Sequence, residues 1–142
     1  ESDPLVQREF AEMEILLESA RAVLWKHAEE VMSGDLFSQL SVQEAQAKTG
    51  LAKTIPCTNA VKIVERIPNV IGGMAYSRKL PFERIWRDIQ AGPVMPYNNH
   101  QIWRACGATS LGVRLHPELG EAETGIHSRP KDLDQDPLVA AV

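Results

Sequence analysis

The sequence predicts an all-α protein of the antiparallel, up-down four-helix-bundle type. Apolar residues recur at helical spacing over four segments, helix-start and helix-stop residues mark the segment ends, and no segment shows the two-residue period of a strand. Short turns between amphipathic helices make neighbouring helices antiparallel. A chain of 142 residues with 44% hydrophobic content is also long enough to build one core.

The first predicted helix covers residues 4–33. Asp3 is a suitable N-cap before Pro4, and Gly34 is typical of a helix end. Apolar residues at alternating steps of three and four define one face: Val6, Phe10, Met13, Leu17, Ala20, Leu24, Ala28 and Val31. A short apolar linker, which we expect to pack under the turn, follows: Leu36, Phe37 and Leu40.

The second predicted helix begins at Ser41 and runs to Val70. Ser41 and Glu44 form a capping box, in which hydroxyl and carboxylate each accept a hydrogen bond from an otherwise unpaired backbone N–H. Pro56 lies inside the helical pattern, where it removes one backbone hydrogen bond and crowds the preceding turn. We therefore expect one helix with a kink rather than two helices. Gly50 keeps the helix surface low enough for another helix to approach closely.

A third, shorter helix is predicted after a glycine pair. Gly72 and Gly73 end the second helix, and Pro81 takes the first position of a helix that extends to about Ala91. We expect this helix to end at three breaking residues: Gly92, Pro93 and Pro96.

A fourth helix is predicted from Asn98 to about Leu115. Asn98 and Gln101 form a second capping-box pattern, and apolar spacing continues from Ile102 to Val113. Four amphipathic helices joined by short turns complete the predicted bundle.

The charges divide the chain into two regions. Residues 1–115 carry 13 basic and 13 acidic side chains, whereas residues 116–142 carry 2 basic and 6 acidic ones. We expect the first region to be the bundle domain and the second, which contains several prolines and glycines, to be an acidic flexible tail. A neutral body gives no counterion-release drive towards nucleic acid and no basic patch for a lipid surface.

No apolar run approaches the roughly 20 residues that span a bilayer, and no targeting pattern opens the chain. We therefore expect a cytoplasmic protein with neither membrane nor nucleic-acid partners. Cys57 and Cys106 are too few and too far apart for a metal-type spacing, and the histidines lack partners at ligand spacing. No metal site is predicted.

The most informative stretch, from Ile71 to Leu111, reads I-G-G-M-A-Y-S-R-K-L-P-F-E-R-I-W-R-D-I-Q-A-G-P-V-M-P-Y-N-N-H-Q-I-W-R-A-C-G-A-T-S-L. A glycine pair, a Pro-x-Glu-Arg-x-x-Arg-Asp helix start and a later Gln-Ile helix follow one another. This order resembles the C-terminal helical domain of acyl-CoA dehydrogenases, and the likeness extends upstream over residues 4–34 and 41–70. The opening D-P-L-V-Q-R-E-F resembles the family's second bundle helix, so we expect the first helix to be missing and an apolar groove to remain.

The resemblance implies a flavoprotein domain that contacts FAD and forms a homo-oligomer, a dimer or a tetramer. A middle β-domain and an N-terminal helical domain complete the family's active site, which oxidises an acyl thioester, so this chain alone is expected to be inactive. The implied cofactor-binding residues are Asn69, Gly72, Gly73, Asn99 and Gln101. Asn69 stands where the family often has the longer glutamine. Structural alternatives are a helix C-cap for the glycine pair and a capping box for Gln101.

The base that removes the α-proton is, in most of the family, a glutamate just before the Gln-Ile helix. No acidic residue occurs here between Asp88 and Glu118. Tyr97 occupies the base position when counted back from Gln101, and Pro96 does when counted forward from Asp88. Because an unperturbed tyrosine has a pKa near ~10, it is a poor base at neutral pH, and the catalytic residue stays unassigned.

Three interpretations of the missing carboxylate remain. A minority of the family carries the glutamate on the first bundle helix, so a longer protein could still be a dehydrogenase. The fold also resembles that of two-component flavin monooxygenases, which need no α-proton base, and there His100 would lie near the flavin. Alternatively, the chain is a helical interaction module without chemistry.

A basic cluster surrounds the start of the third predicted helix. Its arginines and lysine are suited to phosphates of a cofactor or of coenzyme A, but Glu83 and Asp88 are available to pair with them as well. The cluster comprises Arg78, Lys79, Arg84 and Arg87.

Overall fold

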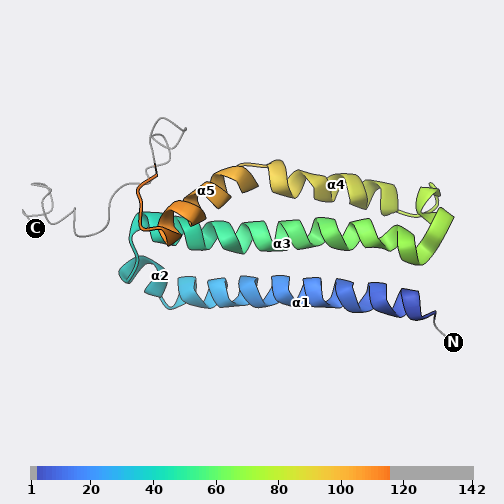
Figure 1. The fold of residues 1–142 in the computed structure, drawn as a ribbon, viewed down its shortest axis with the longest axis horizontal. Helices are drawn as coiled ribbons and strands as arrows, with labels where there is room; N and C mark the ends of the chain where they lie inside the picture. Colours follow the sequence, from blue (N-terminus) through green and yellow to red (C-terminus); the bar gives the residue numbers. More distant parts are fainter. Residues whose placement is uncertain (1–2, 116–142) are drawn as a thin grey trace, which may run out of the picture. The chain divides into compact units, whose positions relative to one another are not determined.

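The structure, a computed structural model, describes residues 3–115, which form helices and connecting turns with no strand among them (Figure 1). The predicted all-α class is confirmed. The helical elements are α1 (Pro4–Met32), α2 (Asp35–Ser38), α3 (Val42–Ile71), the 3₁₀ helix η1 (Gly72–Tyr76), α4 (Phe82–Val94) and α5 (Asn99–Ser110). The predicted tail, residues 116–142, lies outside the described residues.

Capping residues define the predicted helix starts. Asp3 Oδ1 accepts a hydrogen bond from the backbone N–H of Leu5 at 2.9 Å, which caps α1. At α3, the Ser41 N–H donates to the Glu44 carboxylate at 2.9 Å, and the Glu44 N–H donates to Ser41 Oγ at 3.3 Å. This reciprocal pair confirms the predicted capping box.

Glycine ends α1 and also stops α5 earlier than expected. Gly34 has a φ of 81°, the left-handed conformation that suits a helix C-terminus. Gly112 has a φ of 67°, and the N–H of Val113 donates to the Ala108 carbonyl at 2.9 Å. This 6→1 hydrogen bond is that of a Schellman motif, so α5 ends at Ser110 and the predicted end near Leu115 is wrong.

Two further segments differ from the sequence predictions. The apolar linker after α1 contains the short helix α2, and Leu36 within it is only 2% exposed. Helix α4 continues through Gly92 and Pro93 to Val94 instead of ending near Ala91. A Cβ on Gly92 would lie 3.1 Å from Cys57 Sγ, so the close packing of α4 on Cys57 favours a glycine at this position.

The described residues divide into two compact units, which we call unit 1 (residues 3–25 and 52–98) and unit 2 (residues 26–51 and 99–115). Helices α1 and α3 each contribute to both units. The prediction of a single bundle domain over residues 1–115 stays a prediction.

Unit 1 is held together by polar groups between α1 and α3. Asn59, which is 8% exposed, donates from Nδ2 to the Leu16 carbonyl and to Ser19 Oγ, both at 2.8 Å. Helix α3 runs on without interruption through Pro56 and through Pro68. The prediction of one helix rather than two is therefore confirmed.

Unit 2 has its core where α3 meets α5. Ile102 is 1% exposed, and a Cβ added to Gly50 would lie 2.7 Å from Ile102 Cγ2. Gln43 Nε2 donates to the Val113 carbonyl at 2.9 Å and so ties α3 to the segment after α5. The sequence prediction that Gly50 allows close helix approach is confirmed.

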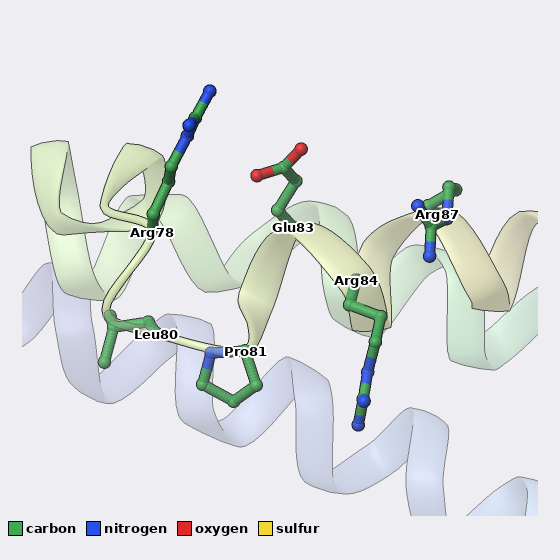
Figure 2. A pocket seen from close by; sticks show the side chains of 6 residues that line it. All are labelled: Arg78, Leu80, Pro81, Glu83, Arg84 and Arg87. Carbon is green, nitrogen blue, oxygen red and sulfur yellow. The ribbon is translucent and has the colours of Figure 1, made fainter.

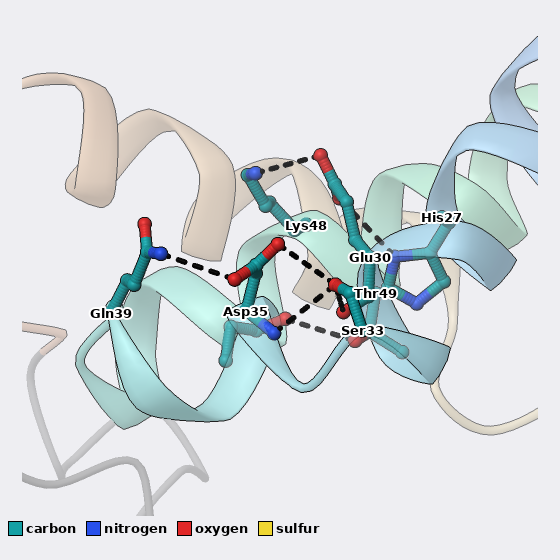
Figure 3. Close-up of polar contacts among 8 residues, drawn as sticks. His27, Glu30, Ser33, Asp35, Gln39, Lys48 and Thr49 are labelled. Carbon is teal, nitrogen blue, oxygen red and sulfur yellow. Dashed lines mark hydrogen bonds and ion pairs between the residues drawn. The ribbon is translucent and has the colours of Figure 1, made fainter.

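A chain of polar contacts surrounds the turn between α1 and α2 in unit 2 (Figure 3). Ser33 Oγ donates to Asp35 Oδ2 at 2.8 Å, and Gln39 Nε2 donates to Asp35 Oδ1 at 3.1 Å. Lys48 on α3 reaches Glu30 on α1 at 3.0 Å. The Asp35 side chain thus stabilises the turn through its contacts with Ser33 and Gln39. The ion pair between Lys48 and Glu30 joins α1 to α3 within this unit.

Candidate functional site

The predicted glycine pair forms the beginning of η1 in unit 1, directly after α3. Gly72 has a φ of 59°, so its backbone conformation favours glycine, whereas Gly73 has no positive φ. Both residues are exposed, and no atom lies within 4 Å of a Cβ built on either one. Packing therefore does not require a glycine at Gly73, and its backbone is open to approach from outside the unit.

Asn69 lies on the last turns of α3 and contacts a carboxylate of α1. Its Nδ2 donates to Glu9 Oε1 at 3.3 Å, while Arg66 Nη1 donates to Glu9 Oε2 at 2.8 Å. Arg66 also pairs with Glu12, to which Arg8 donates at 2.9 Å. The predicted cofactor ligand thus borders an ion-pair cluster that sequence reasoning missed, because its members lie on helices far apart in the chain.

Charge within this cluster shifts two pKa values. The hydrogen bond from Arg8 is the largest cause that lowers the pKa of the Glu12 carboxyl; desolvation by burial partly opposes it, and the charge of Arg66 lowers the pKa further. The hydrogen bond to Glu9, followed by the charge of Glu12, raises the pKa of Arg66. Both shifts favour the charged forms of these two side chains.

The cluster predicts an acid-dependent loss of stability. Because the pKa of Glu12 is lower in the folded chain than its usual 4.5, its contribution is present above that value and is lost as the pH falls through the folded pKa. Glu12→Gln should therefore lower the free energy of unfolding at neutral pH, and the difference from wild type should shrink in acid. Urea unfolding at a series of pH values measures this difference.

The control for this experiment is Glu65→Gln, which changes an exposed carboxylate of α3. We expect little change from it at any pH. A Glu12→Gln difference that stays constant from neutral to acidic pH would contradict the assignment.

An open pocket of about 510 Å³ in unit 1 is lined by three residues of the predicted basic cluster, all but Lys79 (Figure 2). The side chains of Arg78 and Arg84 extend in opposite directions, and Arg87 pairs with the exposed Asp88 at 3.3 Å. The pocket residues are Arg78, Leu80, Pro81, Glu83, Arg84 and Arg87. The guanidinium groups of Arg78 and Arg84 do not converge on one point, and phosphate binding here stays a prediction.

The pocket and the glycine pair belong to one part of unit 1. Helix α4, which carries Arg84 and Arg87, contacts η1, which begins with Gly72 and Gly73. The structure therefore places the predicted backbone contact and the predicted phosphate contacts on adjoining elements.

Tyr97 follows α4 at the end of unit 1. Its hydroxyl is buried and has no hydrogen-bond partner among the described residues, while its carbonyl accepts from Lys53 Nζ at 3.0 Å. No described carboxylate or histidine is hydrogen-bonded to this hydroxyl to take up its proton. The contacts thus fix the backbone at Tyr97 and leave a catalytic role unassigned.

The remaining predicted residues begin α5 in unit 2. Asn99 is 6% exposed and Gln101 is half-buried, whereas His100 is exposed. The His100 ring meets Trp103 edge to face, with centroids 5.2 Å apart. The predicted residues therefore fall into two groups, with Asn69, Gly72, Gly73 and Tyr97 in unit 1 and Asn99, His100 and Gln101 in unit 2.

Within residues 3–115, no three His, Cys, Asp or Glu side chains are grouped so that they could hold a metal ion. Cys57 and Cys106 are free thiols, and burial raises the pKa of Cys106. In the same part of the chain, no helix combines the length and apolar character needed to cross a membrane.

Comparison with known families gives one match. The family model described as acyl-CoA dehydrogenase, C-terminal domain, matches residues 2–95. The matched region includes Asn69, the glycine pair and the basic pocket, and it ends before Tyr97 and α5. No curated protein and no solved structure was found to match the chain.

Proposed function

Because the chain belongs to the acyl-CoA dehydrogenase family, whose C-terminal domain it matches, we propose that it contacts FAD and mediates oligomerisation in an acyl-CoA dehydrogenase-like flavoprotein. In this proposal the complete flavoprotein oxidises an acyl thioester, and the chain alone is inactive. The observation that supports it best is the glycine turn after α3, whose backbone at Gly73 is open although neither packing nor conformation requires a glycine there.

The residues of unit 1 fit a flavin cofactor. The space beside Gly72 and Gly73 would be narrowed by any side chain, so glycine allows a ligand to approach the backbone closely. The amide oxygen of Asn69 accepts no hydrogen bond from the described residues and can accept one from a ligand. Arg78 and Arg84 extend in opposite directions (Figure 2), so each can meet a separate phosphate oxygen but the two do not form one phosphate site. When bound, FAD supplies the electron acceptor for the oxidation.

The loop between α4 and α5 supports a binding role for the chain rather than a catalytic one. No acidic residue occurs between Asp88 and Glu118, and the hydroxyl of Tyr97 has no hydrogen-bond partner among the described residues. In the proposal, the α-proton base is therefore supplied from outside this loop.

Gly73→Ala tests the flavin contact separately from folding. We expect its free energy of unfolding to stay within about 0.5 kcal/mol of wild type, because the added methyl group meets no atom. Flavin titration followed by absorbance should show weak binding by the wild-type chain and weaker binding by Gly73→Ala. Gly72→Ala differs from Gly73→Ala because the φ of Gly72 is left-handed, so its free energy of unfolding should fall by about 1–2 kcal/mol.

The matched control is Gly107→Ala, an exposed helix glycine in unit 2 that has no neighbour at its Cβ position. Its flavin binding should equal that of wild type. Equal binding by Gly73→Ala and wild type would rule out the glycine contact, and tight binding of FAD by a monomeric chain would contradict the proposed dependence on a larger assembly.

The loop without a carboxylate also favours a second candidate, a flavin-dependent monooxygenase domain of the same fold, because that reaction needs no α-proton base. A helical interaction module without chemistry would equally tolerate the loss. An upstream reading frame that continues into a β-domain would support either flavoprotein, and a start codon just before Glu1 would support the module.

A further inference from the structure

We propose that α1 pairs antiparallel with α1 of a second copy of this chain through an apolar stripe on its exposed surface. The stripe consists of Phe10, Leu17 and Leu24, which are 57%, 36% and 49% exposed. Their seven-residue spacing places them along one line of the helix, about 21 Å from first to last. The inference rests on the oligomer contact of the proposed function and names its surface.

The stripe is the outer part of a wider apolar face. The inner part packs within unit 1, where Val6 and Met13 are half-buried and Ala20 is buried. The exposed stripe thus lies beside a line of apolar residues that is already packed. Side chains of a second helix can interdigitate with such an exposed apolar stripe. A contiguous exposed apolar line of this kind is typical of an interaction surface.

Two charges beside the stripe favour the antiparallel direction. Glu14 and Arg21 are both exposed and lie on the same flank, about 40–60° around the helix from Leu17. Glu14 precedes Leu17 by three residues, and Arg21 follows it by four. Glu14 forms no ion pair with the described residues, and Arg21 pairs among them only with the exposed Glu18, at 2.6 Å.

Consider two antiparallel α1 helices related by a two-fold axis at Leu17. Residues on the same flank of the two copies then face each other, so Glu14 of each copy lies within about 1.5 Å along the helix axis of Arg21 of the other. The pair therefore forms two symmetric ion pairs, with Phe10 packed opposite Leu24. A parallel pair in register keeps Glu14 and Arg21 of the two copies a full turn or more apart. Of the two directions, only the antiparallel one therefore brings Glu14 of one copy next to Arg21 of the other.

Cross-linking at the two-fold axis tests this geometry. Leu17→Cys should give a covalent dimer with a short bis-maleimide reagent, because residue 17 of one copy faces residue 17 of the other. Ala22→Cys, an exposed α1 position away from the stripe, is the matched control and should not cross-link through residue 22. Peptide mapping by mass spectrometry separates these products from reaction at Cys57 or Cys106, and circular dichroism confirms that each variant is folded.

Charge reversal tests the direction. Glu14→Arg and Arg21→Glu should each weaken dimerisation in sedimentation velocity, and the double reversal should restore most of it. Added salt should weaken the wild-type dimer. A wild-type chain that stays monomeric at its highest soluble concentration, or a dimer that does not cross-link at residue 17, overturns the inference. Flavin titration reports separately on the proposed function, so the two failures are distinguishable.

Discussion

Gly50→Ala is expected to lower the free energy of unfolding by about 1–3 kcal/mol, although alanine favours a helix over glycine by about 1 kcal/mol. The added Cβ would lie 2.7 Å from Cγ2 and 3.1 Å from Cγ1 of Ile102. Ile102 is 1% exposed, and a β-branched side chain has little freedom to turn away. Either Ile102 or the backbone of α5 must therefore move. Urea unfolding followed by circular dichroism measures the loss.

Two further variants make this prediction specific. Gly107→Ala should stabilise the chain by about 0.5–1 kcal/mol, because it gains helix propensity without any contact at its Cβ position. Ile102→Ala alone should cost about 2–5 kcal/mol, and Gly50→Ala should then cost little more in that background. If the effects of Gly50→Ala and Ile102→Ala simply add, the close approach of these two residues is not the cause.

Leu36→Ala is expected to destabilise the chain by about 2–5 kcal/mol, the range for a leucine removed from a core. Leu36 belongs to the short helix α2 and is 2% exposed. Truncating it leaves a cavity in the core of unit 2, and the cost is larger the less the surrounding residues relax into that cavity. Thermal and urea unfolding give the change, with Leu36→Met as a variant of similar volume that should lose less than about 1.5 kcal/mol.

Leu111→Ala is the control, because Leu111 is 79% exposed. It should change stability by no more than about 0.5 kcal/mol. A small effect of Leu36→Ala, similar to that of Leu111→Ala, would show that α2 does not belong to the core of unit 2.

Much of the helical architecture was predictable because helix ends carry local chemical signals. Asp3 and the Ser41–Glu44 pair mark helix starts through hydrogen bonds that span only two or three residues. The end of α5 was predicted wrongly because apolar spacing continues beyond Gly112, where the backbone turns left-handed. The end of α4 was also wrong, because the packing of Gly92 on Cys57 depends on tertiary structure.

The candidate site was less predictable than the fold. The motif identified both Gly72 and Gly73, but sequence alone does not tell which one needs a positive φ and which one is free. It also gave no indication that Asn69 contacts Glu9, since the two residues lie on different helices. Flavin contact, the base and the oligomer stay proposals that the experiments above address.

The two units meet at three points along the chain. Two of these points lie inside the long helices α1 and α3, and only the third lies in a loop, the one between α4 and α5. Residues 26–51 of unit 2 are inserted between the two segments of unit 1. Truncation from the N-terminus therefore cannot isolate unit 2 intact, nor can truncation from the C-terminus remove it completely. A minimal unit 1 would require the chain to end at residue 98 and, in addition, an internal deletion that shortens both long helices together and joins residue 25 to residue 52 through a new turn.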